Sequence, residues 1–451
     1  MDKTVTVFST CCLAGLLLAG CATSPVDPLG SDNKAWRQIP AWASARMQQR
    51  WWVQYGDADL NRDVAAAFAN NPDLAVIAAR FERADAQVAQ ARAAGLPSLN
   101  LGIGYREGRQ QELDLGPYNL APWQGGGQFS WELDLSGRLR AATRSAKAAR
   151  DAAFWDLHAA RLQMASRIAA TRFNLYRFNA EMAFLEESTR ASQETVSTLK
   201  SRADAGIIAG TDYHRQLAEH EKFKRLRVDV KRLRDIAVVQ LRALTGGGAV
   251  SGTTRRDIPS PRNLSSLSLA QLLKANPTLL AAEARVRSTF QLEKSARLDL
   301  LPSFRLNASA TGAGNSLTGR YKVWQHQVGP ALDIPIYDPV RLARIKVRRA
   351  EGKAAAAQYR SAVLLVLEEV ERAQVNWRSR RQQLQMAQRE IASLGKTRAD
   401  AAARFKAGIT SQIEYLDAER RWLETKRAEA ALQQLLVNDH INLIKALGGA
   451  S

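Results

Sequence analysis

The sequence contains only three cysteines, and Cys11, Cys12 and Cys21 all lie within the first 21 of its 451 residues. No disulfide bond can therefore link the rest of the chain. Glycine and proline are also few, at 28 and 14 residues, which excludes a collagen-like repeat. With 46% hydrophobic residues, the chain is too apolar for a disordered protein. Its fold must be stabilised by packing and by assembly.

Catalytic and metal-binding motifs are missing as well. No nucleophile elbow, P-loop or dinucleotide-binding glycine motif is present. No two of the five histidines have the four-residue spacing that places metal ligands on one helix face; they are His158, His214, His220, His326 and His440. The sequence therefore predicts a protein that is not an enzyme, has no catalytic residues and needs neither a metal nor a cofactor.

The charge of the chain is strongly positive, because 64 lysines and arginines against 44 aspartates and glutamates give a net charge of +20. Such a charge fits either a nucleic acid or an anionic membrane surface as a partner. The N-terminus favours the membrane, since Lys3 is followed by an apolar run over residues 5–18, the pattern of an export signal. A chain that leaves the cytoplasm is expected to bind no nucleic acid.

The end of this signal, Leu18-Ala19-Gly20-Cys21, resembles a bacterial lipobox. We expect residues 1–20 to be removed as a lipoprotein signal peptide and Cys21 to carry the lipid, followed by an extended segment over 21–57. The alternative is that Cys21 merely belongs to a membrane segment, but the apolar run is too short to cross a bilayer. Ala22 stands where an inner-membrane lipoprotein would have Asp, which points to the outer membrane.

The remainder of the chain contains a duplication. Asn71-Pro72 recurs as Asn276-Pro277, and Gly206-Ile207 recurs as Gly408-Ile409, so the copies are offset by about 200 residues. A unit of this size is too long for a short solenoid repeat. Three predicted regions follow, with a first repeat over 58–245, a linker over 246–266 and a second repeat over 267–451.

Each repeat combines two strands with long helices. Alternating apolar and polar residues predict strands at about 97–106, 127–136, 302–312 and 325–337. The stretch from Arg138 to Ala205 contains neither glycine nor proline. Its counterpart from Val340 to Ala407 contains two glycines and no proline. Each stretch predicts one helix of about 100 Å. The two shorter helices of a repeat nearly match this length when placed end to end.

The strands alone are equally compatible with an ordinary soluble sheet. Four strands cannot close a barrel, however, and their free edges would be a liability unless other copies of the chain supply the missing strands. Each strand has about ten residues, the length that spans an outer membrane when tilted. We therefore predict a mainly α-helical fold of long, antiparallel, coiled-coil-like helices from two tandem repeats, with a small membrane β-barrel portion.

These features together resemble the outer membrane factor family of TolC-like channels, and specifically its NodT-like lipoprotein branch in multidrug efflux. The segments that carry the resemblance are Trp51-Trp52, Asn70 to Leu74, Ser130 to Leu135, Asp333 to Asp338, and Arg404 to Arg420. The resemblance implies a homotrimer with a shared barrel of twelve strands and a helical tunnel through the periplasm. It also implies three further partners: a periplasmic adaptor, an inner-membrane pump of the RND type and outer-membrane lipids.

The resemblance further implies a closable aperture at the tunnel end opposite the strands, where the helices turn at Gly206 and Gly408. Arg404 would clamp a neighbouring helix, Ile413 and Asp417 would narrow the pore, and Thr211 would belong to the same aperture. Phe405 departs from the family, which commonly has a tyrosine there.

Passive conduction of drugs or other toxic compounds across the periplasm and outer membrane is the function that this resemblance predicts. The alternative is a lipid-anchored, non-conducting coiled-coil structural protein of the periplasm. A trimer that resists mild solubilisation and opens ion currents in a planar bilayer would distinguish the channel from the structural protein.

Overall fold

The computed structural model describes residues 50–107, 109–112, 116–119, 122–261, 275–314 and 323–449. The expected signal peptide, Cys21 and most of the segment 21–57 lie outside these residues. The described end of that segment is not extended as expected, because Trp51–Tyr55 forms a 3-10 helix, η2. Trp51 and Tyr55 are buried, and the Tyr55 ring packs edge-on against Phe173 with the centroids 5.1 Å apart. Burial of these two aromatic side chains folds the segment onto the helices.

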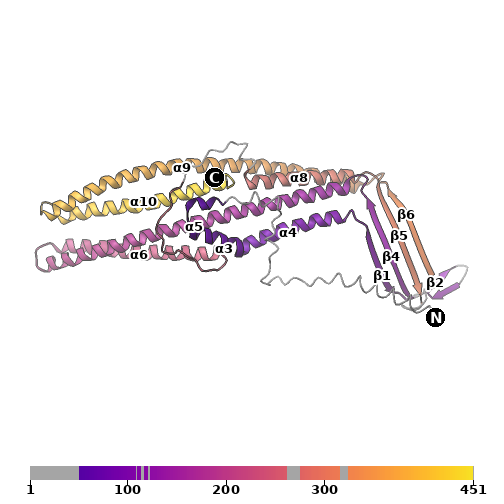
Figure 1. The fold of residues 1–451 in the computed structure, drawn as a ribbon, viewed down its shortest axis with the longest axis horizontal. Helices are drawn as coiled ribbons and strands as arrows, with labels where there is room; N and C mark the ends of the chain where they lie inside the picture. The colour runs from indigo at the N-terminus through magenta and orange to yellow at the C-terminus, as the bar shows by residue number, and fades with distance from the viewer. Residues whose placement is uncertain are drawn as a thin grey trace. The chain divides into compact units, whose positions relative to one another are not determined.

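Each half of the chain contains one very long helix and two shorter ones (Figure 1). The bounds of these helices are α4 Pro72–Ala93, α5 Arg138–Asp204, α6 Gly210–Leu244, α8 Pro277–Leu298, α9 Pro339–Lys406 and α10 Gln412–Ala446. A further helix, α3 over Ala58–Asn70, precedes them and was not expected from the sequence. The mainly helical fold is thereby confirmed. Within the described part of the chain, no helix is both long and apolar enough to cross a membrane.

The two shorter helices of each half meet end to end, as their lengths predict. The Asn71 side-chain oxygen accepts two backbone N–H groups from the first turn of α4, at 3.0 and 3.2 Å. Its amide nitrogen donates to the carbonyl of Leu244, at the end of α6, over 2.9 Å. Asn276 repeats this arrangement and donates to the carbonyl of Ala446, at the end of α10, over 3.0 Å. One asparagine therefore caps the start of one helix and the end of another.

Four strands form one antiparallel sheet in the order β1-β4-β5-β6, which confirms the expected number of strands in the main sheet. Their bounds are β1 Ser98–Tyr105, β4 Trp123–Leu133, β5 Ser303–Gly314 and β6 Val323–Asp333. A separate pair, β2 Arg109–Glu112 and β3 Gly116–Asn119, was not expected.

Two of the expected strands end too late, at 136 and 337. Strand β4 stops at Leu133 because the carboxylate of Asp134 turns to accept the backbone N–H groups of Leu139 and Arg140 at the start of α5, at 3.0 and 2.9 Å. Strand β6 ends at Asp333, two residues before Pro335.

The helices lie in the same order as the strands (Figure 1). Helix α4 leads into β1, β4 leads into α5, α8 leads into β5, and β6 leads into α9. Helix α5 packs against α4, α6, α8 and α10, while α9 packs against α8 and α10. Helices α4 and α6 therefore form the edge of the helical layer on the side of β1. Helix α9 forms the other edge, on the side of β6.

Candidate functional site

One face of the four-stranded sheet is apolar. The register places Leu99 of β1 opposite Phe129, and the same row continues across the sheet to Ala308 and Val328. Leu101 and Val328 are 77% and 74% exposed, so the described chain leaves this face open. Aromatic side chains mark both ends of the face, with Tyr105, Trp123 and Trp324 at one end and Trp131 and Phe304 at the other. Such a band is typical of the lipid-facing surface of outer-membrane strands.

The opposite face of the sheet is polar. One row of residues in register across all four strands is Asn100, Gln128, Ser309 and Gln327. Nearer the helices, the Ser130 hydroxyl donates to Oδ1 of Asn307 over 3.1 Å. At the end of the strands, Glu132 and Arg305 form an ion pair at 3.5 Å. A face of this kind suits contact with water.

The two edges of the four-stranded sheet have no partner strand in the part of the chain that the structure describes. Among the described residues, β1 pairs only with β4, and β6 pairs only with β5. Each edge therefore exposes a row of backbone N–H and C=O groups that is ready to pair with another strand. Strands β1 and β6 are antiparallel to each other, because three antiparallel pairings separate them. Pairing β6 of one copy with β1 of the next would keep the whole sheet antiparallel.

The helix turns expected at Gly206 and Gly408 have the same geometry. Gly206 has a φ of 67° and Gly408 a φ of 71°, a conformation that favours glycine. The N–H of Ile207 donates to the carbonyl of Arg202 over 2.9 Å, and the N–H of Ile409 donates to the carbonyl of Arg404 over 2.9 Å. Both turns are Schellman motifs that end a long helix. They lie together at the end of the helices that is remote from the sheet (Figure 1).

The two charged residues predicted at the aperture are paired within their own helices. Arg404 forms an ion pair with Asp400, one turn earlier in α9, at 3.0 Å. Asp417 of α10 pairs with Arg420 at 2.7 Å and with Arg421 at 2.9 Å. The hydrogen bond from Arg420 is the main cause that holds the pKa of Asp417 below its usual value. Within the described chain, the structure does not bring Arg404 and Asp417 together.

Ile413 and Thr211 both lie in the first turn of a helix, close to a turn glycine. The Ile413 side chain is 44% exposed, and Thr211 is exposed as well. Neither side chain forms a hydrogen bond or an ion pair with a residue that the structure describes. Their predicted role at an aperture concerns other copies and stays a prediction.

A cluster of side chains between α9 and α10 near the turn was missed in the sequence analysis. Arg398 of α9 forms an ion pair with Glu419 and lies over the ring of Trp422, at 4.4 Å from its centroid. Phe405 stacks on Tyr415 with the ring planes 4° apart. The aromatic residue at position 405 thus holds the two helices together. The only sequence signal was the departure from the family at Phe405.

A buried polar cluster ties α3 and the segment after α6 to the middle of α5. Arg172 is fully buried, pairs with Asp63 of α3 and donates to the carbonyl of Ser251 over 2.6 Å. The Tyr176 hydroxyl donates to Asp57 over 2.7 Å. Burial raises the pKa of the Asp63 carboxyl, whereas the charge of Arg172 lowers it. No sequence pattern indicated this cluster, because its members are far apart along the chain.

No group of three or more histidine, cysteine, aspartate or glutamate residues within the described ranges could hold a metal ion.

A family model for outer membrane efflux proteins matches residues 64–247 and 268–449. The chain belongs to the outer membrane efflux protein family. The two matched ranges follow the two halves of the chain.

Relatives and solved structures agree with this family. The pyoverdine export outer membrane protein OpmQ of Pseudomonas putida is 24% identical over 96% of this chain and 95% of its own length. The multidrug resistance outer membrane protein MdtP of Escherichia coli is 25% identical over 96% and 94%. The solved outer-membrane channel OprN superposes with a TM-score of 0.81 at 25% identity, over 89% of this chain and 92% of that one.

The family, the TolC-like fold, the outer-membrane location and the efflux function predicted from the sequence are confirmed by these similarities. The family is one of outer-membrane channels rather than enzymes. The lipid anchor at Cys21 and the aperture residues stay predictions.

Proposed function

We propose that three copies of this chain form the outer-membrane duct of a tripartite efflux system. The duct receives toxic small molecules from an inner-membrane RND-type pump through a periplasmic adaptor and conducts them passively. The protein catalyses no reaction and uses no cofactor. A lipid on Cys21 anchors the N-terminal segment in the outer membrane, and the repeats over 58–245 and 267–451 supply two similar parts of the wall.

The open sheet is the observation that carries this proposal. One sheet of four strands has an apolar face with aromatic rims, a polar opposite face and two free antiparallel edges. Three such sheets joined edge to edge give twelve strands and leave no free edge, with the apolar face toward lipid and the polar face toward a water-filled lumen. The helices follow the order of the strands, so they continue the wall of the duct from the barrel into the periplasm.

The aperture belongs to the opposite end of the duct. Around a threefold axis, three copies of Asp417 would bring three carboxylates together, which would attract cations and repel anions at the narrowest point. Ile413 and Thr211 would lie on the same rim, and Arg404 would hold a neighbouring helix by charge-assisted hydrogen bonds. The ion pair between Arg404 and Asp400 would then have to break, or Arg404 would have to bond to Asp400 and to the neighbouring helix at the same time.

A pair of neighbouring substitutions tests the orientation of the sheet. Leu101→Arg places a charge on the apolar face in mid-strand, which should destabilise the inserted barrel by about 2–4 kcal/mol and reduce the yield of outer-membrane trimer. Asn100→Arg places the same charge on the polar face and should leave the yield unchanged while shifting ion selectivity toward anions. Equal yields for both variants would contradict the assignment of the faces.

Conduction itself is tested on the full-length protein in mild detergent and in planar bilayers. We expect a trimer that opens stepwise ion currents, and a deletion strain that becomes sensitive to several unrelated compounds. A monomer without currents would overturn the proposal and favour the lipid-anchored structural protein.

A further inference from the structure

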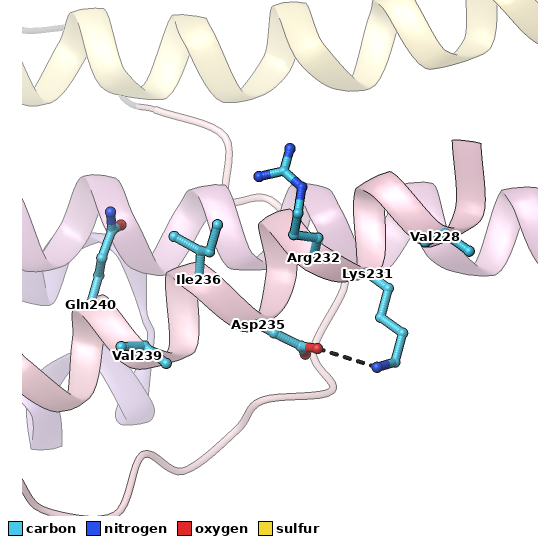
Figure 2. Close-up of a pocket in the computed structure, with 7 residues that line it drawn as sticks. All are labelled: Val228, Lys231, Arg232, Asp235, Ile236, Val239 and Gln240. Carbon is cyan, nitrogen blue, oxygen red and sulfur yellow. Dashed lines mark hydrogen bonds and ion pairs between the residues drawn. The ribbon is translucent and has the colours of Figure 1, made fainter. Parts of the chain in front are cut away.

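A shallow groove of about 510 Å³ runs along the exposed side of α6, between residues 228 and 240 (Figure 2). Its apolar members are Val228, Ile236 and Val239, and these side chains are 70%, 41% and 61% exposed. Apolar residues that recur along one side of a helix normally face a packing partner. The groove therefore indicates a surface that another element covers.

The side of α6 that carries the groove points away from the rest of the layer. Val230, Ala237 and Leu241 are the buried apolar residues of α6, and they share the face that packs toward α5. Val228 and Val239 are eleven residues apart, close to three full turns, and at 3.6 residues per turn they lie opposite that buried face. Figure 2 shows Val228, Asp235 and Val239 along the same side of the helix.

Helix α9, on the other edge of the layer, carries a matching stripe. Val375 and Met386 are 64% and 65% exposed and are also eleven residues apart. The buried residues of α9 at this level, Ala373, Ala387 and Ile391, lie on the opposite side of the helix, toward α10. The two exposed pairs thus have the same spacing on the two outer edges of one copy.

The stripes also lie at the same height along the helices. Lys222 of α6 lies 3.9 Å from Glu424 of α10, and Arg398 of α9 contacts α10 through Glu419. Both α6 and α9 are therefore aligned to α10, and counting 1.5 Å per residue from these contacts sets the groove within one helical turn of the exposed stripe on α9. Because α6 and α9 run in opposite directions, the order of the apolar residues is reversed between them.

We infer that α9 of a second copy of this chain fills the groove on α6, running antiparallel, with Met386 against Val228 and Val375 against Val239. The inference rests on the trimeric channel proposed above. Pairing β6 of one copy with β1 of the next places α9 of the first beside α6 of the second, since the helices follow the order of the strands. Between the two apolar pairs, Asp235 faces Ser379.

Two pairs of oppositely charged residues flank the inferred contact between α6 and α9, which we call the seam. In the inferred register, Arg242 of one copy flanks the seam opposite Glu371 of the next, and Arg225 flanks it opposite Glu390. Arg225, Arg242 and Glu371 form no ion pair with any residue that the structure describes. These three side chains gain partners of opposite charge when copies meet edge to edge, while Glu390 also accepts a hydrogen bond from Thr425.

Disulfide trapping tests the register, and the chain suits it because its natural cysteines are confined to positions 11, 12 and 21. Two full-length double variants combine matched positions, Val228→Cys with Met386→Cys and Val239→Cys with Val375→Cys. Two controls swap the same four substitutions, so that the paired positions are about 16 Å apart along the seam. A disulfide needs Cα atoms within about 7 Å. Each variant is oxidised in native outer membranes and separated on non-reducing gels.

We expect covalent dimers and trimers from both matched variants, at least tenfold more than from the swapped controls or from any single cysteine. Planar-bilayer currents of the protein without introduced cysteines are recorded in parallel. Conducting protein whose matched pairs cross-link no better than the swapped pairs would overturn the seam and leave the channel function standing. Matched cross-links confined to one chain, or to a different protein, would also overturn it. Loss of both currents and trimer would instead count against the proposed function.

Discussion

Asn71→Ala should destabilise the protein more than the loss of an ordinary helix cap does. The side chain makes three hydrogen bonds, two that it accepts from the first turn of α4 and one that it donates to the carbonyl of Leu244. Loss of an N-cap costs about 1 kcal/mol, and a buried carbonyl left without its donor costs about 1–3 kcal/mol. Asn71 is 6% exposed, so water cannot readily replace the side chain. The expected loss in the free energy of unfolding is about 2–4 kcal/mol.

Ser411→Ala is the matched control for this prediction. Ser411 caps α10 by accepting the N–H of Glu414 over 3.3 Å, but it is exposed and holds no second helix. Its removal should cost about 1 kcal/mol or less. Urea unfolding of the full-length protein in detergent, followed by circular dichroism at one fixed protein concentration, measures both variants. If Asn71→Ala costs no more than Ser411→Ala, the double role of the asparagine is wrong.

Three further predictions concern the buried cluster, the anchor and the aperture. Arg172→Met leaves the Asp63 carboxylate buried without its partner and should cost about 3–5 kcal/mol in urea unfolding, much of it recovered by adding Asp63→Leu. Cys21→Ser should abolish incorporation of labelled fatty acid, and equal labelling of the variant would contradict the lipobox. Arg404→Ala with Asp417→Ala should raise single-channel conductance and let vancomycin leak into cells without a pump; unchanged conductance in an intact trimer would rule out this aperture.

The sequence predicted those parts of the fold that depend on local pattern or on repetition. Gly206 and Gly408 marked the ends of the long helices because a left-handed turn favours glycine. Asn71-Pro72 and its repeat Asn276-Pro277 marked the duplication, and in the structure each asparagine caps a helix that begins at the proline. Alternation of apolar and polar residues marked the strands, although their ends depended on the cap at Asp134, which is a contact of the folded chain.

Contacts between distant residues were beyond sequence reasoning. Helix α3 was not expected because its amphipathic pattern is short, and its position depends on the pairing of Asp63 with Arg172, more than a hundred residues away. Arg404 was expected to reach a neighbouring helix, whereas within one copy it pairs with Asp400, since an acidic residue one turn away on the same helix is the nearest partner. A site shared by three copies cannot be completed from one of them.

The joints where α4 meets α6 and α8 meets α10 lie beside helices that run past them without a break, since α5 has 67 residues and α9 has 68. No cross-section of the layer therefore interrupts every helix at once. Bending at a joint requires α5 or α9 to curve, which lengthens backbone hydrogen bonds along its convex side. A sideways force at the Gly206 and Gly408 turns is thus transmitted to the sheet through the unbroken helices α5 and α9. It does not produce a bend at the joints between the shorter helices.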